Sequence, residues 1–188
     1  SPHADARRLL DEILVSRRIY APFIGKGGSV YAANREREQY MKTNLQRHLA
    51  AAEASGEAMP RLFFKFGSNH LAWGRSATDV ISLGPFAREL AWARGLGSFN
   101  MMADCLGGQS RDPRSGEGVP CESILPAGDD SLRRYALPGQ WTLIDLAALR
   151  PHKKLWQDLD EPSQRLIWWF DAWLAVPEPS PAGLVTGP

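Results

Sequence analysis

The sequence predicts an α/β protein with a small, mostly parallel or mixed sheet that is flanked by helices. Apolar residues at helical spacing alternate with short apolar runs that glycine or proline ends. A strand, a helix and a second strand follow one another between residues 62 and 103, which is typical of a right-handed βαβ unit. The 188 residues are 44% hydrophobic and 23% charged, which suits one globular domain. We therefore expect a single domain, 1–188, or the C-terminal part of one.

Residues 1–33 are predicted to form an N-terminal helix and a loop. Residues 5–20 place Leu9, Leu10, Ile13 and Leu14 at helical spacing, and Pro22 with three glycines marks a loop over 21–33. A second helix is expected from about residue 34 to 55, and it closes at Gly56. Its apolar stripe consists of Met41, Leu45, His48, Leu49 and Ala52.

Residues 34–106 are expected to form a core of this helix and a βαβ unit. The run 62–66 is short and aromatic and ends at Gly67, which indicates a buried strand. Gly84-Pro85 opens a helix that ends near Gly95, and residues 98–103 are expected to form the next strand.

The remainder divides into a long loop, closing elements and a tail. Residues 107–139 are rich in Gly, Pro, Ser and Asp and are expected to form the long loop. Cys105 and Cys121 are compatible with either a disulfide or two free thiols. Within 140–176 we expect a short ordered piece at 141–149, a partial helix at 156–165 and a strand at 167–176 with Trp168, Trp169 and Trp173 in the core. The tail, 177–188, has four prolines and is expected on the surface.

The charge balance and the motifs that the sequence lacks narrow the range of expected partners and cofactors. Lys and Arg total 22 against 21 acidic residues, so we expect neither nucleic acid nor a membrane as partner. No apolar run is long enough to span a bilayer, and we expect a soluble protein. The chain begins at Ser1 without a leader pattern, which leaves the cytoplasm and the periplasm open. Metal and nucleotide motifs are missing and the four histidines are scattered, so we expect no cofactor and no metal, and a small-molecule substrate or ligand.

His70 is the first candidate for chemistry because it follows the predicted strand 62–66. Ligands of open parallel sheets bind at the carboxyl ends of strands. An imidazole exchanges a proton near neutral pH, and Asn69 could donate a hydrogen bond to a carbonyl oxygen. The alternative is a histidine that only caps the strand.

Charged residues supply the other candidates. Arg37 and Glu38 lie at the start of the core stripe, where an ion pair could line a pocket. The alternative is a solvated first turn, in which Glu38 interacts with the helix dipole and Arg37 lies along apolar surface. Lys65 needs a partner if it is buried, and it could equally face solvent on an edge strand.

Three segments, taken in order, carry a family resemblance. The first is Arg-Glu-Gln-Tyr-Met-Lys-Thr-Asn at 37–44; the second is 62–70, followed by a glycine-initiated helix and strand within 84–108; the third is Phe170-Asp171-Ala172, leading to Pro181-Ala182. In this order they resemble the C-terminal half of the erythromycin esterase family, within the larger group that also holds the haem-binding ChaN-like proteins. Of that family's His-Asn-x-His element, His70 matches the second histidine, while Gly67 and Ser68 stand at the first His and the Asn.

The resemblance implies a hydrolase that activates water to attack an ester or lactone of a small molecule, without a metal. His70, Asn69 and Glu38 are the expected catalytic residues, and Arg37, Lys65 and Arg75 are expected to bind the substrate. The family places further catalytic groups in an N-terminal half, so we expect this chain to be part of a larger erythromycin esterase-like domain. A non-catalytic protein that holds a small ligand or haem on the same scaffold is the alternative. A sheet of few strands leaves an open edge, which a homodimer or a missing half would cover.

Overall fold

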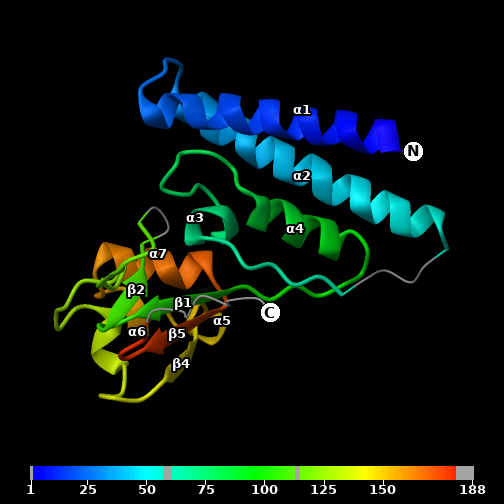
Figure 1. Cartoon of the computed structure of the whole chain (residues 1–188). Helices are drawn as coiled ribbons and strands as arrows, with labels where there is room; N and C mark the ends of the chain where they lie inside the picture. Colours follow the sequence, from blue (N-terminus) through cyan, green and yellow to red (C-terminus); the bar gives the residue numbers. More distant parts are fainter. Residues whose placement is uncertain (1, 57–60, 113–114, 181–188) are drawn as a thin grey trace, which may run out of the picture. The chain divides into compact units, whose positions relative to one another are not determined.

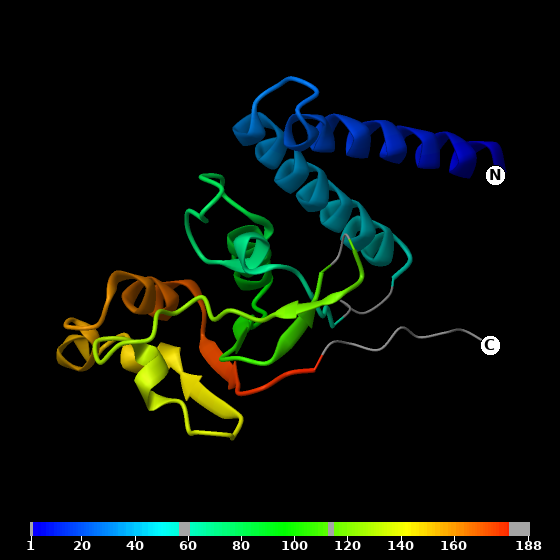
Figure 2. The same ribbon diagram turned by 60° about the vertical axis from the view of Figure 1, so that its left-hand side comes forward.

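The computed structural model describes residues 2–56, 61–112 and 115–180 (Figures 1 and 2). It divides into two compact units, Ser1–Ser98 and Phe99–Pro188, which we call the N-terminal and C-terminal units. The N-terminal unit is helical in its described part, and the C-terminal unit holds a small mixed sheet with flanking helices. The predicted fold class is therefore confirmed. No helix among the described residues is both long and apolar enough to cross a bilayer.

Two long helices begin the N-terminal unit, α1 (Pro2–Tyr20) and α2 (Val30–Ala54), joined by the 3-10 turn η1 (Ala21–Ile24). They lie side by side as a hairpin, and the exposed Arg18–Glu36 ion pair of 2.8 Å links them (Figure 1). Both predicted helices are confirmed. However, α2 begins four residues earlier than expected, because the Ser29 hydroxyl accepts a hydrogen bond from the Ala32 amide and caps the helix there.

Periodicity located these helices but not their buried faces. The stripe Leu9, Leu10, Ile13 and Leu14 is 53–62% exposed, whereas Ile19 is buried. On α2, Leu49 is buried but His48 is exposed. The helical spacing of the α1 stripe therefore does not mark a buried face, and the prediction of a core stripe on α2 is wrong for His48.

The predicted strand 62–66 is wrong. Residues 61–67 have no regular secondary structure and join no sheet, and Phe63 is 90% exposed. Asn69 and His70 consequently do not end a strand but lie in the short helix α3 (Ser68–Leu71). Helix α4 (Leu83–Trp92) confirms the helix expected after Gly84-Pro85, but without a first strand the predicted βαβ unit over 62–103 does not form.

The sheet of the C-terminal unit has the order β1-β5-β4. Strand β1 (Met101–Cys105) pairs in parallel with β5 (Ala172–Val176), and β4 (Thr142–Asp145) pairs antiparallel with the other side of β5. The strand expected at 98–103 thus begins three residues later. The strand expected at 167–176 is wrong in its first part, because Ile167 to Trp169 end helix α7 (Glu161–Trp169).

Helix α7, strand β5 and Phe170 between them supply a large part of the C-terminal core. Trp173, Phe170, Leu166 and Ile167 are almost fully buried, together with Leu146. Leu146 opens α5 (Leu146–Leu149), which is followed by α6 (Lys153–Trp156). Of the three tryptophans expected in the core, Trp173 is fully buried, Trp169 is partly buried and Trp168 is exposed.

The long connection after β1 contains a small hairpin and a 3-10 turn. Strands β2 (Gln109–Arg111) and β3 (Gly118–Pro120) pair antiparallel, and η2 (Leu132–Tyr135) follows. Of the tail, Pro177 to Ser180 are exposed or partly exposed, and residues 181–188, with the Pro181-Ala182 piece, lie outside the described residues.

Cys105 and Cys121 form a disulfide, which resolves the alternative that their sequence left open. The bond ties the end of β1 to the residue after β3, across a sequence separation of 16. Closing a loop of this length removes conformations from the unfolded chain and is worth about 3 kcal/mol. We expect a Cys105→Ser, Cys121→Ser double variant to lose about 3 kcal/mol of unfolding free energy in urea. Equal denaturation curves for the oxidised wild type, the reduced wild type and this variant would contradict the prediction.

Candidate functional site

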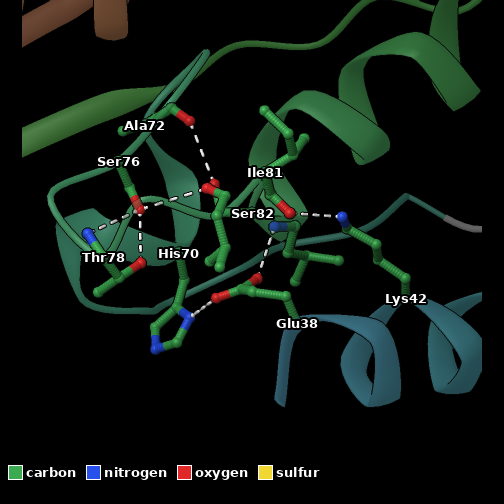
Figure 3. A network of polar contacts seen from close by, with 10 residues as sticks. Glu38, Lys42, His70, Ala72, Ser76, Thr78, Ile81 and Ser82 are labelled. Atoms are coloured by element: carbon green, nitrogen blue, oxygen red, sulfur yellow. Dashed lines mark hydrogen bonds and ion pairs between the residues drawn. The ribbon is translucent and has the colours of Figure 1, made fainter. Parts of the chain in front are cut away.

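Three segments of the N-terminal unit meet around one buried carboxylate, that of Glu38 on α2 (Figure 3). Helix α3 contributes His70, and the start of α4 contributes the backbone around Ser82. Only 3% of Glu38 is exposed, so its charge must be compensated by close hydrogen-bond donors.

Both oxygens of this carboxylate accept hydrogen bonds. Glu38 Oε1 lies 2.5 Å from His70 Nδ1, and Oε2 accepts the Leu83 amide at 2.8 Å. A carboxylate is an acceptor, so the short contact requires the proton of the imidazole to be on Nδ1. In the neutral ring, Nε2 then carries the free lone pair. The His70 side chain is 21% exposed, so solvent reaches the ring that carries Nε2.

Lys42 stands one turn after Glu38 on α2, and its Nζ donates to the Ile81 carbonyl at 2.6 Å. Burial lowers the pKa of Lys42 from its ordinary value, and the Glu38 carboxylate opposes this by favouring the charged ammonium. The Glu38 carboxylate therefore binds the backbone amide of Leu83, and the Lys42 ammonium binds the backbone carbonyl of Ile81, two residues earlier in the chain.

The loop between α3 and α4 is fixed by its own hydrogen bonds (Figure 3). The Ser82 hydroxyl donates to the Ala72 carbonyl at 3.3 Å and so closes the loop at its base. Ser76 Oγ lies 2.7 Å from Thr78 Oγ1. These contacts bring Leu83 and the end of α3 into one small region.

The structure brings two of the six expected site residues together, Glu38 and His70. The expected Arg37–Glu38 ion pair does not form. The Glu38 carboxylate binds His70 and the Leu83 amide instead. The Arg37 guanidinium lies 5.0 Å from the ring centroid of Tyr20 and 5.3 Å from that of Phe23. The alternative of a solvated first turn also fails for Glu38, which is buried in the third turn of α2.

The other expected residues lie at the surface. Asn69 is exposed beside His70, and Lys65 is exposed on the irregular segment before α3 rather than on a strand. Arg75 is exposed and pairs with Asp79 at 2.9 Å. In the described part of the chain, none of these three is joined to Glu38 or His70 by a hydrogen bond or ion pair.

Sequence reasoning missed Lys42 and the backbone from Ile81 to Leu83. A signal for Lys42 was present, since a lysine four residues after a glutamate on a helix shares its face. A cavity of about 340 Å³, lined by residues such as Asp129, Arg134 and Lys154, lies in the C-terminal unit and contains none of the expected site residues.

Comparison of the chain with protein-family models, with curated proteins and with solved structures finds no match.

Proposed function

We propose that this protein is an erythromycin esterase-like hydrolase in which His70 activates water for attack on an ester or lactone of a small molecule. The observation that carries the proposal is the buried Glu38 carboxylate, which binds His70 Nδ1 at 2.5 Å. A carboxylate in this place selects one tautomer, keeps the ring in one orientation and stabilises the imidazolium that forms when the ring accepts a proton. The ordered segments around Arg37, His70 and Asp171 that resemble the family support the same assignment.

The proposed reaction uses Nε2 as a general base. Water gives a proton to Nε2 while its oxygen attacks the carbonyl carbon, which yields a tetrahedral oxyanion and an imidazolium paired with Glu38. When the intermediate collapses, the carbon–oxygen bond to the leaving group breaks and the imidazolium returns its proton to the alkoxide. The exposed Asn69 amide next to His70 is the proposed hydrogen-bond donor to the substrate carbonyl.

The test is hydrolysis of a panel of small esters and macrolactones by the purified chain and its His70→Ala variant. We expect the variant to lose turnover by roughly 10³-fold, within the range that a general base contributes. The matched control is His48→Ala, since His48 is exposed on α2 and we expect no change in rate. Circular dichroism checks that both variants fold. Equal rates in wild type and His70→Ala would overturn the assignment of His70.

One observation also suits the alternative of a ligand-binding protein. A histidine that binds a metal ion usually donates the N–H of its other ring nitrogen to a carboxylate, a backbone carbonyl or water, and His70 Nδ1 makes such a contact with Glu38. The haem version predicts a shift of the Soret band on titration with haemin, and loss of that shift in His70→Ala. Ester turnover without such a shift favours the hydrolase, and a His70-dependent shift without turnover favours haem binding.

A further inference from the structure

Glu38 and Lys42 together hold the backbone on both sides of Ser82. Glu38 Oε2 accepts the amide of Leu83 at 2.8 Å, and Lys42 Nζ donates to the carbonyl of Ile81 at 2.6 Å. The two side chains share one face of α2, four residues apart (Figure 3). We call this pair of contacts the backbone clamp.

The clamp is connected to His70 through the carboxylate of Glu38. One oxygen binds the Leu83 amide and the other binds His70 Nδ1, so the direction of the carboxylate depends on where Leu83 lies. Leu83 is the first residue of α4, and its position follows from the extended backbone at Ile81 and Ser82. Lys42 fixes the Ile81 end of that backbone.

Lys42 is more than a solvated lysine with an incidental contact. Its side chain is partly buried, and burial lowers its pKa, which means that the ammonium gives up hydration in this place. A flexible surface lysine keeps its hydration and pays side-chain entropy for each fixed contact. The hydrogen bond to Ile81 and the nearby Glu38 charge offset the lost hydration.

We propose that Lys42 is a positioning residue for the Glu38–His70 pair, and that it acts through the backbone from Ile81 to Leu83. The proposal rests on the proposed function for its kinetic consequence, but its structural consequence can be measured without turnover. Without Lys42, the Leu83 amide shifts, the carboxylate of Glu38 follows it, and His70 loses its fixed orientation.

The kinetic arm compares Lys42→Met, Lys42→Arg and the control Gln46→Met, which removes an exposed polar residue one turn further along α2. We expect kcat to fall about tenfold to a hundredfold in Lys42→Met with KM unchanged, because misplacement of a catalytic group affects the reacting geometry. Lys42→Arg keeps a donor for the Ile81 carbonyl and is expected to restore most of kcat. Gln46→Met is expected to match the wild type.

The spectroscopic arm uses the same variants without substrate. In Lys42→Met we expect faster hydrogen exchange at the Leu83 amide and loss of the His70 Nδ1–H proton resonance, and neither change in Gln46→Met. An unchanged Leu83 amide and Nδ1–H signal in Lys42→Met would overturn the proposal. If the wild type hydrolyses no ester in the panel, the proposed function fails, while this arm still decides the role of Lys42.

Discussion

Gly84→Ala is expected to destabilise the N-terminal unit by about 3 kcal/mol and to disrupt the site around His70. A Cβ atom at residue 84 would lie 2.1 Å from the Leu71 carbonyl oxygen and 2.6 Å from its carbonyl carbon. These are backbone atoms, so no rotamer change relieves the overlap. Helix α4 must move away from α3, and Leu71 directly follows His70 in α3. We expect a lower urea midpoint and weakened contact between His70 and Glu38.

The matched control for this variant is Gly97→Ala in the same unit. A Cβ at residue 97 would meet nothing within 4 Å, and its backbone does not lie in the left-handed region. Alanine there is expected to be neutral or to stabilise the fold slightly, because it reduces the freedom of the unfolded chain. Equal urea midpoints for Gly84→Ala and Gly97→Ala would show that the close approach of α4 and α3 does not constrain residue 84.

The helices could be predicted from the sequence because their signals are local. The spacing of apolar residues in α2 and the Gly84-Pro85 opening of α4 each act within a few turns. The buried face depends on what packs against a helix, which periodicity does not contain. This is why the stripe at Leu9 to Leu14 predicts a helix correctly but lies exposed on α1.

Two strand predictions were wrong for a related reason. The run 62–66 has the composition of a buried strand, yet a strand also needs a partner with free backbone groups, and composition does not say whether one lies beside it. At residues 167–169, the aromatic run suggested a strand. The Asp160 side chain, which accepts the Ser163 amide at 2.7 Å, and Pro162 in the first turn instead start a helix that continues to Trp169.

Two members of the candidate site, Glu38 and His70, were predictable from the sequence, but its geometry was not. Glu38 and His70 were selected on separate grounds, and a separation of 32 residues gave no reason to place them in contact. Their contact depends on Gly84, which lets α4 approach α3, and on the loop closed by Ser82. Such backbone approaches are tertiary features, so the contacts of Lys42 with Ile81 and of Glu38 with the Leu83 amide became visible only in the folded structure.

Glu38→Gln is expected to preserve the fold and remove most of the activity that His70 confers. The amide has one acceptor and one donor group where the carboxylate has two acceptors. If its oxygen accepts the Leu83 amide, its NH₂ group faces His70 Nδ1, and the ring must then carry its proton on Nε2. An Nε2 that already holds a proton cannot accept one from water. We expect turnover to fall by roughly 10³-fold or more, as other enzymes lose activity when their histidine takes the wrong tautomer.

Glu38→Leu separates this chemical effect from a structural one. Leucine fills similar space but leaves the Leu83 amide and the His70 ring without an acceptor in a buried place, so we expect a loss of about 4 kcal/mol in unfolding free energy. For Glu38→Gln we expect only about 1 kcal/mol, because one hydrogen bond to Leu83 remains. Nitrogen NMR of the imidazole reports directly which ring nitrogen carries the proton in each variant. Full turnover in Glu38→Gln, with the proton on Nε2, would show that Glu38 serves the fold alone and that His70 is not the base.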